Sequence, residues 1–154
     1  MLPREIGELC HEIKQAGFHV TIETAGTIHR ELSCDLMSIS PKFANSDPDE
    51  ERAGEWRAKH QLARYRPGVV KRLMSEYAYQ LKFVVDQPDD LDEIVTYLAE
   101  LKPVDRTRVL LMPQGVEQDE LQQRKRWLVP ICEEHGFTFC PRSHIEWYGN
   151  KRGT

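Results

Sequence analysis

The sequence alternates, along its whole length, between amphipathic segments with helical spacing and short runs of β-forming residues. Strands are predicted at residues 18–23, about 35–39, 80–85, 109–112 and 137–139. Helices are predicted in four places: an opening helix closed by Gly17, residues 67–77, the segment between Pro88 and Pro103, and residues 117–134, with Gly136 ending the last one. Tyr77 is expected to face inward from the second helix, and Leu91, Ile94, Val95 and Leu98 are expected to form the apolar stripe of the third. A loop or short helix is expected at 27–32. The order α-β-(α)-β-α-β-α-β-α-β predicts an α/β fold with a parallel sheet and right-handed crossovers.

The first predicted strand raises a question about its neighbours. A parallel sheet is normally covered on both faces, and a strand should precede the first helix, yet the sequence supplies none. The strand at 18–23 would then expose a pairing edge. We expect either that another element covers this edge or that the chain is the later part of a longer polypeptide.

Two turns that follow predicted strands carry the residues best suited to bind a ligand. The first turn is Glu23-Thr24-Ala25-Gly26-Thr27, and the second is Ser38-Ile39-Ser40-Pro41-Lys42. In parallel α/β sheets, ligands bind beyond the carboxyl ends of the strands, on loops of this composition. Hydroxyl groups, bare backbone at Gly26 and the cation of Lys42 suit a small polar ligand with a carboxylate or phosphate. The alternative is that both are ordinary strand-end turns.

Together with three further motifs, these two turns resemble the 7-carboxy-7-deazaguanine synthases, radical S-adenosylmethionine (SAM) enzymes of queuosine and 7-deazapurine biosynthesis. The resemblance extends nearly end to end. The further motifs are Gln80-Leu81-Lys82-Phe83-Val84-Val85, Leu111-Met112-Pro113-Gln114-Gly115 and Trp147-Tyr148-Gly149-Asn150-Lys151-Arg152-Gly153-Thr154.

The resemblance implies a set of binding residues. Thr24 and Thr154 match positions that contact the substrate. The positions that match SAM contacts are Gly26, Ser40, Pro41, Lys42, Met112, Pro113, Gln114 and Gly115. Ala25 departs from the Asn that is usual in the family. For Thr24 and Ser40 the alternative is backbone capping, for Lys42 a surface lysine, and for Met112 core packing.

The resemblance also implies a fold and a reaction. The family fold is a partial (β/α) barrel, so an incomplete barrel of about five parallel strands is expected here. A 4Fe-4S cluster binds SAM and cleaves it to a 5′-deoxyadenosyl radical. With Mg2+, the enzyme then converts 6-carboxy-5,6,7,8-tetrahydropterin to 7-carboxy-7-deazaguanine, with loss of ammonia. A homodimer and an electron donor such as a flavodoxin are the implied partners, and the catalytic acid–base residues are unknown.

The cysteines do not match the family's cluster-binding loop. Cys10, Cys34, Cys132 and Cys140 contain no C-x-x-C pair, and no local metal site is predicted. Upstream of the segment that matches Leu2–Ala16, family members carry two strands, a helix, the three-cysteine loop and a Gly-Gly-Glu-Pro motif. We therefore expect this chain to correspond to the C-terminal two-thirds of the enzyme and to be inactive alone. The thiols are expected to be reduced, with Cys10 in the core and the last two buried.

Composition sets broader limits. With 154 residues, 40% hydrophobic and 30% charged, the chain is expected to be one soluble domain, residues 1–154, with a polar insertion at 43–66. Its net charge of −4 argues against binding nucleic acid. No apolar run approaches the ~20 residues that cross a membrane, and no signal peptide is evident. A cytoplasmic protein is expected.

Other assignments remain open. Glu23 is expected to pair with Lys82, and His144 and Trp147 are expected to pack near the barrel bottom or tail, with pterin stacking as the alternative. One alternative function is a non-catalytic nucleoside-binding or scaffold half-barrel. Another is a metal-independent α/β enzyme that uses Glu23 and Lys42.

Overall fold

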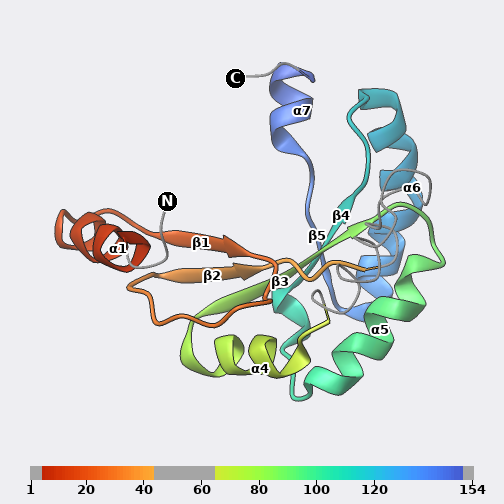
Figure 1. Ribbon diagram of the computed structural model, residues 1–154. Coiled ribbons are helices and arrows are strands. Elements are labelled where there is room, and N and C mark those ends of the chain that lie inside the picture. The colour runs from red at the N-terminus through yellow and green to blue at the C-terminus, as the bar shows by residue number, and fades with distance from the viewer. Residues whose placement is uncertain (1–4, 44–64, 151–154) are drawn as a thin grey trace, which may run out of the picture. The chain divides into compact units, whose positions relative to one another are not determined.

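The computed structural model describes residues 5–43 and 65–150 (Figure 1). Five strands form one sheet in the order β1-β2-β3-β4-β5, so that β1 and β5 are its two ends and the sheet is open. The strands are β1 (Thr21–Thr24), β2 (Leu36–Ile39), β3 (Tyr79–Val85), β4 (Val109–Pro113) and β5 (Thr138–Phe139). The predicted α/β class, with a parallel sheet that forms an incomplete barrel, is confirmed.

In the described part of the chain, one helix precedes β1 and one lies in each connection from β2 to β5, as the sequence predicts, and a further helix follows β5. They are α1 (Glu5–Gln15), α4 (Pro67–Glu76), α5 (Asp90–Leu101), α6 (Gln118–His135) and α7 (Ser143–Tyr148), with a 3-10 turn η2 (Arg106–Arg108) before β4. Gly136 ends α6 in the left-handed conformation, with φ of 68°, as predicted from its position after the last apolar residue. The sequence analysis did not predict α7.

By its internal contacts the chain divides into two compact units. The first unit comprises Met1–Lys42 and Asp47–Leu81, and the second comprises Phe43–Ser46 and Lys82–Thr154. The predicted insertion at 43–66 falls almost wholly at 44–64, outside the described residues.

The core of the first unit forms around β2. This strand pairs in parallel with β1, and Thr24 lies opposite Ile39 in the register. Met37, Ser38 and Ile39 are buried in succession, which is the pattern of a strand covered on both faces. On α4, which packs against β2, Val70 and Leu73 are buried, at the i, i+3 spacing of one helical face.

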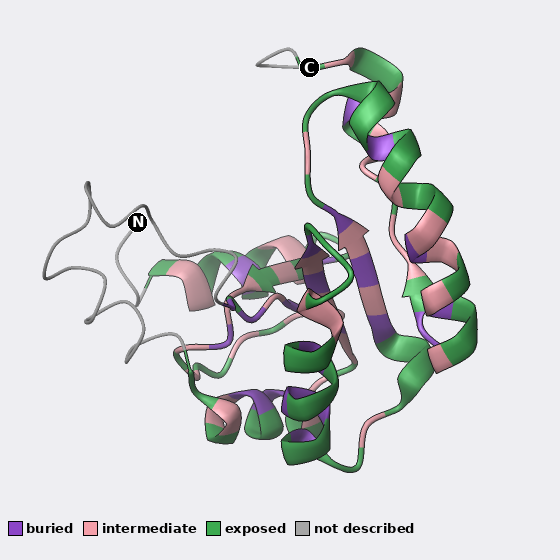
Figure 2. Ribbon diagram, turned by 90° about the vertical axis from the view of Figure 1, so that its right-hand side faces the viewer, coloured by how far each residue is buried: buried purple, intermediate pink, exposed green. Residues whose placement is uncertain are grey.

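The core of the second unit forms between β3, β4 and the helices that follow them. Along β4, buried residues alternate with half-buried ones, and Figure 2 shows such alternating bands on the strands. Phe43, although it belongs to the predicted polar insertion, is only 5% exposed. Its ring stacks on Phe83 at 5.4 Å and meets Tyr97 edge to face at 5.3 Å. The insertion therefore begins with a core residue.

The first strand starts later than the predicted residue 18. Phe18 lies in the turn after α1, where its amide donates to the Ile13 carbonyl, and its side chain is 66% exposed. The Val20 amide donates to the Asp35 carboxylate rather than to a strand neighbour, at 2.8 Å. The ladder with β2 begins only at Thr21 because those two contacts hold the preceding backbone.

No helix forms at 27–32, the segment for which a loop or short helix was expected. Tyr77, at the end of α4, holds this loop instead. Its hydroxyl accepts from the Leu32 amide at 2.9 Å and donates to the Arg30 carbonyl at 3.2 Å. Tyr77 is therefore half-buried by a loop rather than facing the core as predicted.

The apolar face of α5 differs from the predicted stripe. Val95, predicted to face inward, is 38% exposed. The buried positions are Ile94, Tyr97, Leu98 and Leu101, which follow the i, i+3, i+4, i+7 pattern. Tyr97, which was not part of the predicted stripe, is buried, whereas Val95, which was part of it, is exposed.

The segment after β5 also differs from its prediction. In α7 the buried residue is Ile145, at 4% exposure, whereas Trp147 is 73% exposed and His144 is exposed. Residues two apart on a helix point to different sides, so burial of Ile145 directs Trp147 outward. The predicted packing of His144 and Trp147 is wrong.

Candidate functional site

The carboxyl ends of β1 and β2 bring the first two predicted motifs together. The strands are parallel neighbours, so the loops after Thr24 and Ile39 leave the sheet at the same edge. The Ser40 amide donates to the Thr24 carbonyl at 2.7 Å, which joins the two loops directly. The first unit thus places the hydroxyls of Thr24 and Ser40 on adjacent loops, as the strand-end argument predicts.

The turn after β1 is built around Gly26. Its φ of 71° lies in the left-handed region, and its amide donates to the Thr24 hydroxyl oxygen at 3.1 Å. A Cβ at this position would lie 2.7 Å from Val70 Cγ2 and 2.9 Å from Ile39 Cγ2. The fold itself therefore requires glycine here. The Thr24 oxygen acts as a turn cap, while its hydroxyl hydrogen can still be donated to a ligand.

The turn after β2 ends in a cation. Lys42 is exposed, and its Nζ lies 3.5 Å from the Ser40 hydroxyl, while Pro41 between them is buried. Ser38, the residue before the last one of β2, is fully buried, and its hydroxyl accepts a hydrogen bond from the side-chain amide Nε2 of Gln80 at 2.9 Å. An ammonium group beside a hydroxyl can bind a ligand carboxylate and a ligand hydroxyl together.

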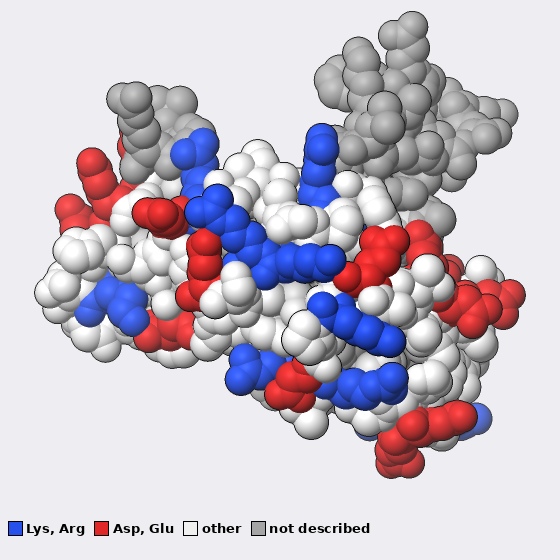
Figure 3. All heavy atoms as spheres, turned by 90° about the horizontal axis from the view of Figure 1, so that it is seen from below, with Lys and Arg blue, Asp and Glu red and all other residues white. Residues whose placement is uncertain are grey.

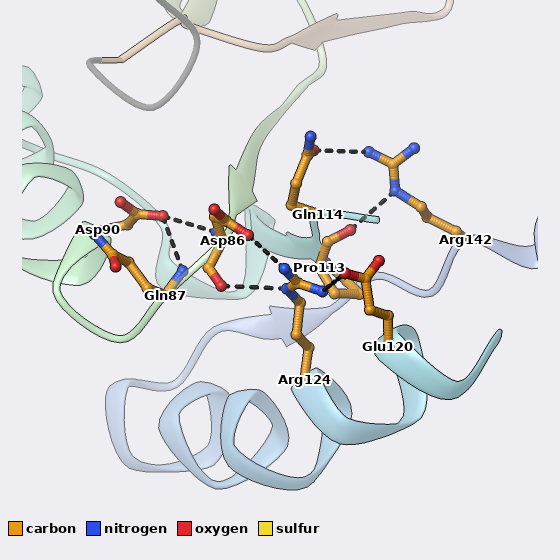
Figure 4. Close-up of polar contacts among 8 residues, drawn as sticks. All are labelled: Asp86, Gln87, Asp90, Pro113, Gln114, Glu120, Arg124 and Arg142. Carbon is orange, nitrogen blue, oxygen red and sulfur yellow. Dashed lines mark hydrogen bonds and ion pairs between the residues drawn. The ribbon is translucent and has the colours of Figure 1, made fainter. Parts of the chain in front are cut away.

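In the second unit, the predicted motif Leu111–Gly115 covers the end of β4 and the turn that follows it. The Gln114 amide donates to the Val85 carbonyl at 2.8 Å, which ties this turn to the end of β3. Pro113 is buried and Met112 is half-buried. Arg142 reaches the turn from the segment after β5: its Nε donates to the Pro113 carbonyl at 2.9 Å, and Nη2 lies 3.4 Å from Gln114 Oε1 (Figure 4).

A second arginine fixes the end of β3 in the same unit. Arg124 of α6 pairs with the Asp86 carboxylate at 2.6 Å, donates to the Asp86 carbonyl at 3.2 Å, and lies 3.4 Å from Glu120 (Figure 4). The Asp90 carboxylate accepts from the Asp86 and Gln87 amides, at 2.7 and 3.2 Å. Partial burial disfavours the charged form of Arg124, but hydrogen bonds to Asp86 and Glu120 outweigh it and raise its pKa.

Neither arginine is among the predicted site residues. The strand-end rule, applied to the strand at 80–85, would have pointed to Asp86 as the next residue. Arg142 follows the last strand by three residues and gave a similar but weaker signal. Arg124 gave none, because a charged residue on an amphipathic helix is usually part of a solvated face.

The cysteines behave as core and boundary residues. All four are free thiols. Cys10 and Cys132 are buried, as predicted for both, whereas Cys140 is half-buried rather than buried as predicted. Burial raises the pKa of the Cys132 thiol to about 11, which keeps it protonated at neutral pH. Within residues 5–43 and 65–150, no group of three His, Cys, Asp or Glu side chains is placed to hold a metal ion. These residues do not fit an iron–sulfur cluster.

Two predictions about single residues are not tested by the described structure. Thr154, predicted to contact substrate, lies outside the described residues, and the Glu23–Lys82 ion pair stays a prediction.

The surface shown in Figure 3 carries basic side chains beside acidic ones. Among the helices that the structure describes, none combines the length and the apolar character needed to span a membrane.

An open parallel α/β sheet with polar loops at the carboxyl ends of its strands defines an α/β protein of the incomplete-barrel class. Comparison with characterised proteins narrows the class. The chain is 39% identical over its whole length to the 7-carboxy-7-deazaguanine synthase of Rhodopirellula baltica and 40% identical, over 89% of the chain, to that of Halobacterium salinarum. It is 27% identical to the Pyrobaculum aerophilum synthase over 97% of the chain.

The chain belongs to the 7-carboxy-7-deazaguanine synthase family, as its motifs predict. It spans 57–61% of the length of these three relatives. No protein-family model matches the chain, and no solved structure matches it.

Proposed function

We propose that this chain is the part of a 7-carboxy-7-deazaguanine synthase that holds SAM and the pterin from the carboxyl ends of the strands. The reaction proposed is the radical conversion of 6-carboxy-5,6,7,8-tetrahydropterin to 7-carboxy-7-deazaguanine, a carbon–nitrogen lyase reaction that releases ammonia. The observation that carries the proposal is 39% identity to such a synthase across the entire chain.

Residues of the first unit have the chemistry to hold SAM. The Lys42 ammonium can pair with the SAM carboxylate, and the Ser40 hydroxyl, 3.5 Å from it, can bond a ribose oxygen. The Thr24 hydroxyl, fixed by the Gly26 amide, can donate to the pterin. In the second unit, Met112 and Pro113 at the end of β4, with Gln114 and Gly115 of the turn after it, can contact the adenosine portion. SAM, when bound with a reduced cluster, supplies the radical that removes hydrogen from the substrate.

We propose that the cluster and the magnesium ion take ligands from outside residues 5–43 and 65–150. None of the four cysteines stands in C-x-x-x-C-x-x-C spacing, and the described residues offer no metal-binding group. We therefore propose that this chain by itself binds its small molecules but does not turn them over. A homodimeric assembly, a flavodoxin-type electron donor and a cytoplasmic location complete the proposal.

The decisive experiment uses the longest reading frame that contains this chain. The product is purified anaerobically, reconstituted with iron and sulfide, and assayed by mass spectrometry for 7-carboxy-7-deazaguanine made from the pterin, SAM and a reductant. We expect turnover that requires all three. A reconstituted protein with an intact cluster that forms no product would contradict the proposal.

Variants connect the assay to the strand-end loops. Lys42→Ala should raise KM for SAM by about tenfold, since a charge-assisted hydrogen bond contributes about 1.5–3 kcal/mol. Lys71→Ala is the matched control, because Lys71 is an exposed lysine on α4. Equal KM values for the two variants would remove Lys42 from the site. Equilibrium dialysis of this chain with SAM tests binding alone. If SAM binds but the protein encoded by the longest reading frame shows no turnover, a nucleoside-binding scaffold is favoured.

A further inference from the structure

Arg142 is a guanidinium that burial has partly removed from water. It lies just before α7, and its contacts are with the turn after β4, 29 and 28 residues earlier in the chain. Burial lowers the pKa of Arg142, although the group stays protonated at physiological pH. A cation in this position is stabilised chiefly by the oxygen atoms that accept its hydrogen bonds.

The contact between Arg142 and Gln114 determines whether the oxygen or the nitrogen of the Gln114 side-chain amide faces outward. A guanidinium carries only hydrogen-bond donors, so the atom facing it must be the amide oxygen. Figure 4 shows Gln114 Oε1 directed toward Arg142 and the amide nitrogen directed away from it. The exposed Gln114 side chain therefore presents its two N–H donors outward at the carboxyl end of β4, while its oxygen faces Arg142.

Charged side chains also lie close to Gly115, the next residue of this turn. Gly115 has φ of 124°, and a Cβ there would lie 2.9 Å from Glu120 Oε2 and 3.4 Å from Arg124 Nη1. Arg124 in turn is held by Asp86 at the end of β3. Arg142 therefore bonds the end of β4 and Gln114, while Glu120 and Arg124 lie close beside Gly115.

We propose that Arg142 is a positioning residue that acts through Gln114. It fixes the turn after β4 and directs the Gln114 N–H2 toward the ligand, so the ligand group bound there is a hydrogen-bond acceptor. On the proposed function, on which the identity of the ligand rests, this acceptor is a ring nitrogen or ribose oxygen of SAM. The nucleoside is therefore read at β4 by donors, and a ligand that presents a donor there is rejected.

The first test separates the two ends of the amide. In Gln114→Glu the oxygen that faces Arg142 remains, while the outward N–H2 becomes a second oxygen. In the reconstituted product of the full reading frame, this variant should raise KM for SAM about tenfold and leave kcat within about twofold, the pattern of lost ground-state binding. An unchanged KM for SAM would overturn the assignment of donors to this site.

The second test asks whether Arg142 acts through Gln114. Arg142→Ala and Gln114→Ala should each raise KM for SAM about tenfold, and the double variant should raise it no further, because both remove one interaction. Millimolar guanidinium should restore part of the affinity of Arg142→Ala and none of that of Gln114→Ala. A double variant that loses about a hundredfold would show independent action and overturn the proposal. Arg126→Ala, an exposed arginine on α6, is the control.

The third test does not depend on turnover. The backbone N–H of Gln114 donates to the Val85 carbonyl. Its hydrogen exchange should accelerate in Arg142→Ala and stay at the wild-type rate in Arg126→Ala. Equal exchange in wild type and Arg142→Ala would overturn the positioning role. If the wild-type protein proves inactive with SAM, the proposed function fails, and this exchange measurement alone decides whether Arg142 holds the turn.

Discussion

The two units hold their strand-end loops by different forces. In the first unit, the loops after β1 and β2 are held by uncharged contacts: the Ser40 amide on the Thr24 carbonyl, the Gly26 amide on the Thr24 hydroxyl, and close packing of Gly26 on Val70 and Ile39. In the second unit, the turns after β3 and β4 are held largely by arginines on carbonyl and carboxylate oxygens.

The two kinds of contact respond differently to added volume and to salt. Packing and backbone hydrogen bonds depend little on salt, and they tolerate no added volume where the core is dense. Ion pairs between partly exposed groups are screened by salt and tolerate small displacements of flexible side chains. The first unit should therefore fail on a steric change and the second on a change of charge or ionic strength.

The largest effect is expected from Gly26→Ala. The new Cβ would lie under 3.0 Å from two core side chains, at a left-handed φ of 71°. Overpacking and backbone strain together should lower the free energy of unfolding by about 2–4 kcal/mol. Urea denaturation measures this, with Gly7→Ala as the control, since a Cβ at Gly7 of α1 meets nothing within 4 Å. If Gly26→Ala proves as stable to urea as Gly7→Ala, the region around Gly26 is not densely packed.

A smaller effect is expected from Gly115→Ala in the second unit. Its φ of 124° is also unfavourable for alanine, but the nearest atom, at 2.9 Å, is the tip of the Glu120 side chain, which can move. Backbone strain alone should cost about 1–2 kcal/mol. If thermal unfolding of Gly115→Ala shifts as far as that of Gly26→Ala, then the two turns are equally rigid and the comparison fails.

Arg124→Ala should cost about 1 kcal/mol at low salt, because its side chain is only 20% exposed but its partners Asp86 and Glu120 are each 50% exposed. In 1 M NaCl the screening length is about 3 Å, and most of this difference should disappear. Unfolding of the wild type and the variant at both salt concentrations measures it. A loss that salt does not change would indicate that Arg124 acts by packing.

The smallest effect concerns the amino end of β2, away from the candidate loops. Lys14 hydrogen-bonds Asp35, and with the Val20 amide it holds the Asp35 pKa below its ordinary value of 3.8. A lowered carboxyl pKa adds stability at neutral pH, and this stability is lost as pH falls through the folded-state pKa. The stability gap between wild type and Asp35→Asn should stay constant above about pH 5 and narrow below about pH 4. A gap that widens with acid would contradict the assignment.

Local patterns predicted most of the elements and much of the first candidate region. The β-branched and aromatic run at 80–85 and the glycine at 136 gave their strand and helix end to within a residue. Thr24 and Ser40 followed from their positions after apolar runs, because the ends of parallel neighbours meet at one edge. The late start of β1 could not be predicted, since it depends on the side chain of Asp35, which lies 15 residues away from Val20.

The α/β class, the order of the elements and the family motifs could all be predicted from spacing and composition, because each depends on neighbours within a few residues. Three-dimensional contacts were needed to show that Val70 and Ile39 require glycine at position 26, that Trp147 faces outward, and that Arg142 and Arg124 bond the ends of β4 and β3. These facts depend on contacts between residues 26 and 70, 113 and 142, and 86 and 124. The local sequence gives no signal for such distant pairs. An arginine such as Arg124, on the polar face of an amphipathic helix, would be equally compatible with exposure to solvent.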